Sequence, residues 1–273
     1  MNIKDRWMRL RNFQSQDFWA MVCARPLTIL FLLPIVEKKW VTPNRITVCS
    51  ILTKFAGVLF IALDMSYRGG VIGAVLVNLG LILDNMDGTV ARFRNTCTEF
   101  GYYLDKSTDA VMLVLLFWAM GFRGYHFTND IIDLVIPLLG VSGVFVTSYS
   151  KWVSEKVLLG LTVTQKHLKG EIEEYENKKD KGFVWTPPPK RSPLDWIKWL
   201  GKAFFTILYF NEVDIFFWAG LALITEKWWI FNRFNSGFMM LGLVVGPVLF
   251  MFKVWKKEKE VKALKKQKAE VNT

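Results

Sequence analysis

The chain has 273 residues, of which 52% are hydrophobic, with 22 Phe and 12 Trp among them. This composition is too apolar for an ordinary soluble domain of that length, and the apolar runs are spread along the whole chain, so we expect one membrane domain. Cys23, Cys49 and Cys97 form no CxxC pair, which argues against both a disulfide framework and a zinc site. The net charge of +11 leaves two classes of partner open, nucleic acid and membrane lipid.

Residues 1–19 lack the uninterrupted apolar core of a signal peptide. Their apolar side chains fall near helical spacing, at Ile3, Trp7, Met8, Leu10 and Phe13. Four basic residues lie between them. An amphipathic helix on an anionic membrane surface has this pattern, and a disordered basic tail is the alternative. The run PLTILFLLPIV that follows has about 11 residues, too few to cross a bilayer. We therefore expect residues 1–40 to form an N-terminal amphipathic, interfacial segment.

Apolar segments long enough to cross a bilayer cover residues 46–66, 70–91, 99–121, 129–150, 204–226 and 236–255. Their connections differ in basic charge. One side holds Arg45, Arg92, Arg94, eleven Lys/Arg from Lys151 to Lys202 and the lysine-rich C-terminus. The other side holds little more than Arg68, Arg123, Lys227 and Arg233. The positive-inside rule then places both termini in the cytoplasm. Because topology explains the basic excess, with anionic lipid as a further contributor, no nucleic-acid partner is expected.

The sequence thus predicts an all-α integral membrane protein with six transmembrane helices and an N-terminal amphipathic interfacial helix. The membrane domain would cover residues 41–256, including a charged, Pro-rich cytoplasmic loop at 165–200, and a basic cytoplasmic tail would follow at 257–273. Asn211 to Asp214 interrupt the span at 204–226, so an interfacial helix followed by a short span is equally compatible. In the last span, the Gly242-x3-Gly246 spacing permits close helix packing and is compatible with a dimer face.

The most informative segment runs from Asp84 to Asp109 and follows the pattern D-x2-D-G-x2-A-R-x8-G-x3-D-x3-D. An ionised carboxylate at mid-membrane costs about 2.5–3.5 kcal/mol on insertion scales, so intramembrane aspartates are functional candidates. Between the two halves of the pattern, Thr96 and Glu99 have the spacing of a capping box. We therefore expect one helix to end near Arg92 and the next, running antiparallel to it, to begin at Thr96.

The spacing places Asp84, Asp87 and Ala91 on one helix face, and it does the same for Gly101, Asp105 and Asp109 on the next helix. The two faces together would form a cage of four carboxylates. Such hard oxygen donors suit Mg²⁺ or Mn²⁺. A pair of ions about 3.5–4 Å apart would clamp an in-line phosphoryl displacement.

Two further residues of the pattern would suit a phosphate ligand. Gly88 removes a side chain where a ligand could approach the backbone, and Arg92 supplies a fork of donors for phosphate. Nearby cations that neutralise the carboxylates would explain part of the negative charge in the pattern. They would not explain why the pattern also has two glycines and an alanine. Lys54 in the first span is expected to pair with a carboxylate, with a substrate contact as the alternative.

With all its constrained positions filled, the pattern resembles the signature of the CDP-alcohol phosphotransferase family. The segment Thr42 to Thr47 is similar to the TPNxIT sequence that opens that family's first span. Ser148-Tyr149-Ser150-Lys151 with Glu155 is similar to the SYxKARAE sequence that ends its fourth span. Trp152-Val153-Ser154 replaces the family's Ala-Arg-Ala, so an expected arginine is missing and the acceptor is left open. The matches cover residues 42–155.

The resemblance implies a six-helix membrane enzyme, usually a homodimer, with residues 41–256 as its catalytic domain and a cytoplasmic active site. It would transfer a substituted phosphoryl group from a CDP-linked donor to an alcohol acceptor and release CMP. The implied metal ligands are Asp84, Asp87, Asp105 and Asp109, and Asp109 is also the implied general base. The implied CDP-binding residues are Asn44, Thr47, Asp87, Gly88, Ala91, Arg92 and Gly101.

The substrates are less constrained than the reaction. Ser148 and Lys151 would suit an anionic acceptor, although a lysine at the end of a span also reaches the interface by snorkelling. CDP-diacylglycerol, and hence phospholipid biosynthesis, is the favoured donor assignment. A CDP-linked polar alcohol such as CDP-choline or CDP-inositol stays open as donor, and so does a catalytically silent membrane scaffold with the same fold.

Overall fold

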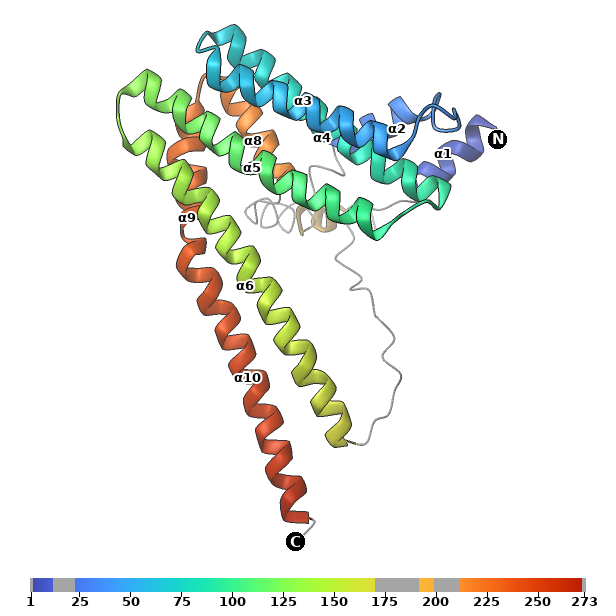
Figure 1. The fold of residues 1–273 in the computed structure, drawn as a ribbon, viewed down its shortest axis with the longest axis vertical. Coiled ribbons are helices and arrows are strands. Elements are labelled where there is room, and N and C mark those ends of the chain that lie inside the picture. Colours follow the sequence, from blue (N-terminus) through green and yellow to red (C-terminus); the bar gives the residue numbers. More distant parts are fainter. Residues whose placement is uncertain (1, 12–22, 170–191, 199–211, 272–273) are drawn as a thin grey trace.

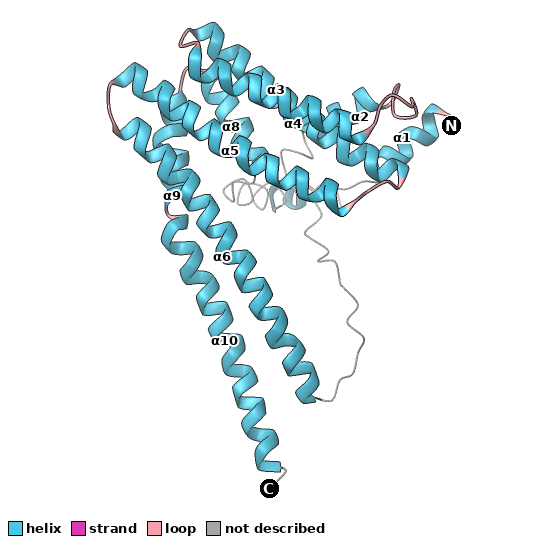
Figure 2. Ribbon diagram, in the orientation of Figure 1, coloured by secondary structure: helices cyan, strands magenta, loops and turns pink. Residues whose placement is uncertain are grey.

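The computed structural model describes residues 2–11, 23–169, 192–198 and 212–271, and within these ranges it contains helices and no strands (Figure 2). The long helices are α3 (Pro43–Leu63), α4 (Tyr67–Arg94), α5 (Glu99–Thr128), α6 (Ile132–Lys169) and α10 (Gly242–Val271). The shorter elements are α1 (Ile3–Arg11), α2 (Arg25–Leu32), α8 (Glu212–Ile224), the π-helical η2 (Ile230–Asn235) and α9 (Ser236–Met240).

Five helical stretches among the described residues are long and apolar enough to cross a membrane. They are Pro43–Leu63, Tyr67–Arg94, Glu99–Thr128, Ile132–Lys166 and Ile230–Lys266. Each coincides with one of the expected spans, which confirms the all-helical membrane fold. The expected span at 204–226 lies outside the described residues as far as residue 211. Its remainder is α8, whose 13 residues are too few to cross a bilayer alone.

The structure corrects the limits of the expected loop and tail. Helix α6 continues to Lys169, so the loop expected from residue 165 begins later. The tail expected at 257–273 is helical as far as Val271, as the end of α10. The two extensions contact each other, because Lys257 Nζ donates to Gln165 Oε1. An ion pair of 2.7 Å between Lys262 and Glu258, one turn apart, also favours helix. Hydropathy therefore predicts where the apolar stretches of α6 and α10 end, but both helices continue beyond that point.

The two glycines of the last span pack against α6 within the same chain. A Cβ atom at either Gly242 or Gly246 would lie 2.6 Å from Thr147 Oγ1. The same hydroxyl donates a hydrogen bond of 3.0 Å to the carbonyl of Gly242. The Gly-x3-Gly spacing thus serves close approach of α10 to α6, and the dimer face suggested for it was wrong.

The turn between α4 and α5 differs from the expected capping box. Helix α4 ends at Arg94, and Asn95 adopts a left-handed conformation with φ 54°. The N-cap of α5 is Thr98, whose Oγ1 accepts a 3.0 Å hydrogen bond from the backbone N–H of Gly101. The expected start at Thr96 was therefore two residues early, because residues 95–97 are needed to reverse the chain.

The helices form two groups that diverge from a common end (Figure 1). Helices α3, α4 and α5 lie side by side, and α6 lies along α10. The groups meet at the connection between α5 and α6. There Asp133 of α6 is fully buried and accepts hydrogen bonds of 2.7 and 2.6 Å from Arg233 of η2. Asn232 beside it donates to the carbonyl of Met120 in α5 at 2.9 Å. We call this end of the molecule the vertex.

The apolar core lies near the vertex, and the N-terminal helices pack elsewhere. Phe117 of α5 and Phe216 of α8 are almost completely buried in the main cluster, which also includes residues of α3 and α4. A second cluster joins Leu10 of α1 and Leu32 of α2 to Val90 of α4. The described part of residues 1–40 therefore contributes α1 and α2, and both pack against the end of α4 that carries the aspartates. Whether they lie in the membrane interface stays a prediction.

The expected orientation can be tested by cysteine labelling, because Lys166 and His126 lie at opposite ends of the long helices. In a background with Cys23, Cys49 and Cys97 replaced by serine, we expect His126→Cys to react with an impermeant maleimide in intact cells and Lys166→Cys to be protected. The basic excess near Lys166 is the physical reason. Permeabilised cells, in which both positions should react, provide the control. The reverse pattern would overturn the assigned topology.

Candidate active site

A cavity of about 1230 Å³ lies between the two helix groups. Every residue that the sequence analysis assigned to metal, CDP or acceptor lines this cavity: Asn44, Thr47, Asp84, Asp87, Gly88, Ala91, Arg92, Gly101, Asp105, Asp109, Ser148 and Lys151. These residues come from α3, α4, α5 and α6. The volume exceeds the usual range of small-molecule sites, about 300–1,000 Å³, and so suits more than one substrate.

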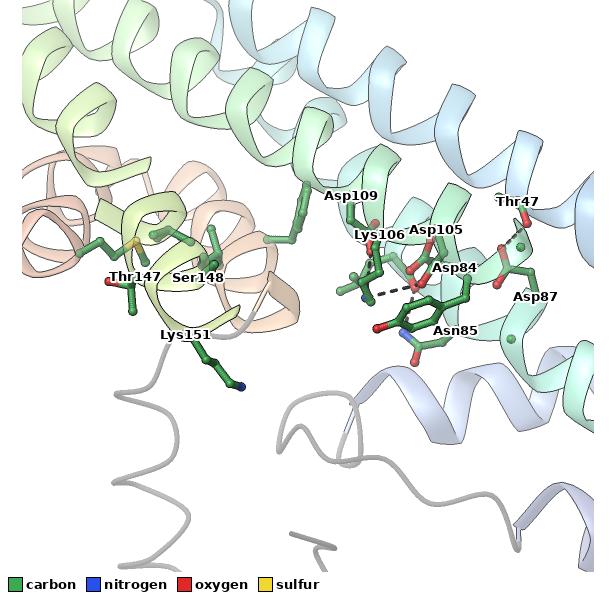
Figure 3. Close-up of a pocket in the computed structure, with 18 of the residues that line it drawn as sticks. Thr47, Asp84, Asn85, Asp87, Asp105, Lys106, Asp109, Thr147, Ser148 and Lys151 are labelled. Carbon is green, nitrogen blue, oxygen red and sulfur yellow. Dashed lines mark hydrogen bonds and ion pairs between the residues drawn. The ribbon is translucent and has the colours of Figure 1, made fainter. Parts of the chain in front are cut away.

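Three of the four proposed metal ligands converge at one point (Figure 3). One oxygen from each of Asp84, Asp105 and Asp109 lies within 4.8 Å of the others. Asp87 lies outside this cluster, one turn further along α4. Its Oδ2 accepts a 2.6 Å hydrogen bond from the Thr47 hydroxyl of α3. The structure thus brings three carboxylates together and holds the fourth beside a residue of the TPNxIT segment.

Buried and half-exposed lysines surround the carboxylate cluster. Lys54 of α3 lies 2.8 Å from Asp109 Oδ1 and 3.1 Å from Asp84 Oδ1, which confirms that it pairs with carboxylates. Lys106 of α5 is half exposed and lies at longer range, 3.5 Å from Asp105 Oδ2 and 3.6 Å from Asp109 Oδ2. Asp109 itself is only 6% exposed. Its carboxylate therefore lies between a cation on the side of α3 and another on its own helix.

The two glycines of the motif leave room for the side chains of Arg92 and Thr98. A Cβ atom at Gly88 would lie 3.4 Å from Arg92 Nη2, so the guanidinium folds back over this glycine. A Cβ atom at Gly101 would lie 3.1 Å from the capping hydroxyl of Thr98. Both glycines therefore keep the cavity wall flat next to the phosphate-binding candidate Arg92 and at the first turn of α5.

The proposed acceptor residues lie on the other helix group. Ser148 and Lys151 line the cavity from α6, across from the carboxylates (Figure 3). Lys151 is 63% exposed, and its ion pair with Glu155 is long, at 3.9 Å. Its ammonium group therefore stays available at the cavity rim.

Comparison with known proteins agrees with this geometry. Residues 40–173 match the model of the family described as CDP-alcohol phosphatidyltransferase. This part of the chain belongs to the CDP-alcohol phosphatidyltransferase family. An uncharacterized protein of Aquifex aeolicus is 30% identical over 117 residues, which are 43% of this chain and 57% of that protein. A CDP-diacylglycerol–serine O-phosphatidyltransferase of Helicobacter pylori is 40% identical over 76 residues, which are 28% of this chain and 30% of that enzyme. The chain thus matches about half of the first relative and under a third of the second.

The carboxylate cluster of the CDP-alcohol phosphatidyltransferase domain fits a divalent cation. Carboxylates this close repel one another unless positive charge lies among them. All the donors at this point are hard oxygens, which Mg²⁺ and Mn²⁺ prefer. They also sit on two helices joined by a short turn, so their relative position is fixed before an ion binds. Asp84, Asp105 and Asp109 are the residues of the described chain that could hold the ion.

Several residues that line the cavity were missed by the sequence analysis. Asn85 and Tyr102 line it next to the motif aspartates and Gly101, and Lys253 lines it from α10. Asn85 and Tyr102 lie inside the motif at positions the pattern leaves open. Lys253 is one of many lysines near the C-terminus, and nothing in their spacing distinguishes it.

Arg25, at the start of α2, does not line the cavity, but it lies close to one of its residues. Its Nη2 is buried and has no hydrogen-bond partner among the described residues. The pKa of Arg25 is lowered to about 10, first by burial and second by the positive charge of Arg92. The guanidinium of an N-terminal helix therefore lies near the arginine of the phosphatidyltransferase motif. A single arginine at the head of an apolar run carries no sequence signal for this placement.

The side of the cavity formed by α9 and α10 is largely apolar. It comprises Phe238, Met239, Leu241, Val245, Leu249 and Phe250, from α9 and α10 and the residue between them. Leu241 and Leu249 are each more than half exposed. Polar groups on one side and exposed hydrocarbon on the other suit a ligand that has a charged headgroup and apolar chains.

Proposed function

We propose that this protein transfers a phosphatidyl group from CDP-diacylglycerol to an alcohol acceptor and releases CMP, as a step of phospholipid biosynthesis. The observation that carries the proposal is one cavity that holds both a carboxylate cluster and an apolar side. A donor with a diphosphate and two acyl chains has groups for both surfaces. The activity named for the Helicobacter pylori relative, which uses CDP-diacylglycerol, supports the same donor class.

In the proposed reaction the acceptor hydroxyl oxygen bonds to the β-phosphorus of the donor. The bond between that phosphorus and the oxygen bridging to the α-phosphate breaks, and CMP leaves with the electron pair. The hydroxyl proton passes to the carboxylate of Asp109. Two divalent cations, Mg²⁺ or Mn²⁺, held by Asp84, Asp87, Asp105 and Asp109, would neutralise charge on the phosphates.

The remaining motif residues would bind the nucleotide half of the donor. Asn44, Thr47, Gly88, Ala91 and Gly101 line the cavity and, with Asp87, would contact the CDP group. Arg92 would contact its phosphates through guanidinium N–H groups. Arg25 lies near Arg92 and would add a second guanidinium for the same anionic group.

The acceptor side of the proposal rests on α6. Replacing Lys151 by Ala is expected to raise the acceptor KM at least about tenfold, because a charge-assisted hydrogen bond contributes about 1.5–3 kcal/mol. Donor affinity should stay unchanged. Steady-state CMP release at varied acceptor concentration measures the acceptor KM. Lys156→Ala is the matched control, since Lys156 is exposed on the same helix and lies over Trp152 at 4.0 Å. An unchanged acceptor KM with weakened CDP binding would contradict the assignment.

A CMP-release assay over a matrix of donors and acceptors tests the function. The purified protein in Mg²⁺ should release CMP from CDP-diacylglycerol in the presence of one class of alcohol acceptor. Turnover of CDP-choline or CDP-inositol instead would assign the donor to the polar-alcohol class. No CMP release from any pair would favour a catalytically silent scaffold. The proposal also includes a cytoplasmic active site and a homodimer. Cross-linking in native membranes tests the homodimer.

A further inference from the structure

Lys54 is one of the most deeply buried large side chains of the described residues, with 2% exposure. It lies in the apolar helix α3, where an ammonium group is costly. Its Nζ is 2.8 Å from Asp109 Oδ1 and 3.1 Å from Asp84 Oδ1, and on another side it lies 5.8 Å from the centre of the Phe216 ring. The ammonium is therefore held between one carboxylate of α4, one of α5 and an aromatic face of α8.

The neighbouring helix is built to admit this side chain. A Cβ atom at Gly80 of α4 would lie 2.5 Å from Lys54 Cγ, so only glycine leaves room for the lysine stem. Ser50, one turn before Lys54, donates a 2.8 Å hydrogen bond to the Gly80 carbonyl and lies 3.4 Å from Asp84 Oδ1. The close approach of α3 and α4 thus fixes the position of the ammonium relative to the carboxylates.

Lys54 contacts two of the three carboxylates that converge on one point, at the place where a divalent ion would bind. We propose that the Lys54 ammonium is an internal counter-ion that neutralises Asp84 and Asp109 when no divalent ion is bound, and that it competes with this ion for the same two carboxylates. The inference rests on the proposed function in one respect, namely that this cluster is the metal site. It assigns Lys54 a positioning role and no contact with substrate.

Opposite effects follow for the two states of the protein. Without a divalent ion, loss of the ammonium removes the nearest cation from the buried Asp109 and the half-buried Asp84, and breaking a buried pair in this way is strongly destabilising. With the ion, loss of the ammonium removes a like charge from the immediate surroundings of the site, so the ion binds more tightly. A lysine with a purely structural role would not produce the second effect.

Lys54→Met tests this inference, because methionine retains an unbranched apolar stem and removes the charge. Lys106→Met is the matched control. Lys106 also faces Asp105 and Asp109, but it is 51% exposed and its contacts are longer, 3.5 and 3.6 Å, so solvent screens its charge. All variants are purified in Mg²⁺ and then divided into samples with EDTA and with Mg²⁺. The readouts are the midpoint of thermal unfolding and the affinity for Mn²⁺ measured by electron paramagnetic resonance.

For Lys54→Met we expect the unfolding midpoint in EDTA to fall by about 5 °C or more, and Mg²⁺ to restore most of this loss. We expect its Mn²⁺ affinity to rise about tenfold, and each effect to be several times smaller in Lys106→Met. Unchanged or weaker Mn²⁺ binding would overturn the competition, and an unchanged midpoint in EDTA would overturn the counter-ion role. Neither readout uses turnover, so a failed CMP-release assay with these results intact would refute the proposed function alone.

A double variant covers the case in which Lys54→Met does not fold. Lys54→Met combined with Asp84→Asn removes one negative charge together with the positive one, and Asn keeps the shape of the side chain. If Lys54 is a counter-ion, the double variant in EDTA is more stable than the single variant. A double variant that also fails to fold would overturn the inference, since removing one of the opposing negative charges would then not relieve the loss of the ammonium.

Discussion

Turnover of the Asp109→Asn variant is expected to fall at least ~10²-fold, the usual loss when general-base catalysis is removed. Its affinity for the CDP-linked donor should stay within about tenfold of that of the unchanged protein, or about 1.4 kcal/mol. The two effects separate because Asn keeps the shape of the side chain and an oxygen that can accept the 2.8 Å hydrogen bond from Lys54. What is lost is the ability to take a proton and one negative charge.

Single-turnover CMP release and equilibrium binding of the donor measure the two effects separately. Asp84→Asn provides a contrast, because this residue belongs to the nucleotide half of the motif and should lose nucleotide and metal binding together. Asp130→Asn is the remote control, since Asp130 forms an exposed ion pair with Arg233 at the vertex. Turnover of Asp109→Asn near the normal rate would exclude it as the base, whereas complete loss of nucleotide binding would make it primarily a metal ligand.

Removal of divalent cations is expected to have an effect at least as large. Exhaustive dialysis against EDTA should lower turnover by at least ~10³-fold, because bound ions supply several kcal/mol of charge stabilisation in phosphoryl transfer. Addition of Mg²⁺ or Mn²⁺ should restore activity, and Zn²⁺ should not be required, since all the proposed ligands are carboxylates.

EDTA saturated with Mg²⁺ is the control for effects of the chelator itself and should leave turnover unchanged. The same samples give the unfolding midpoint, which shows whether the metal-free protein is still folded. Full activity after exhaustive EDTA treatment of a folded protein would contradict the metal-dependent mechanism.

The site was predictable from the sequence because its residues follow helical periodicity. Asp84 and Asp87 recur on one face of α4, and Asp105 and Asp109 recur on one face of α5. A turn of only four residues between the helices ensures that the two faces meet. Membrane spans were predictable for a related reason, since hydrocarbon selects apolar side chains over a fixed length.

What the sequence did not predict depends on contacts between distant segments. The separation of Asp87 from the carboxylate cluster follows from the hydroxyl of Thr47, 40 residues away. Arg25 comes near Arg92 because α2 packs on α4. The helical ends of α6 and α10 stabilise each other outside the apolar stretch, where hydropathy carries no information. The cap at Thr98 was missed because Thr96 and Thr98 are both good N-cap residues, and the chain reversal at Asn95 decides between them.

The vertex has a mechanical consequence for the cavity. Asp133, Arg233 and Asn232 tie α5, α6 and η2 together at one end, whereas the carboxylates lie at the other. From Asp109 to Thr128 helix α5 is about 28 Å long, at 1.5 Å per residue. A rotation of about 5° between the helix groups at the vertex would therefore widen the gap at Asp109 by about 2.5 Å over this lever arm. The four-residue turn keeps α4 and α5 together during such a rotation. Such an opening would leave the carboxylates undisturbed, and its stiffness would be set by the side chains of the vertex, at the opposite end of the molecule.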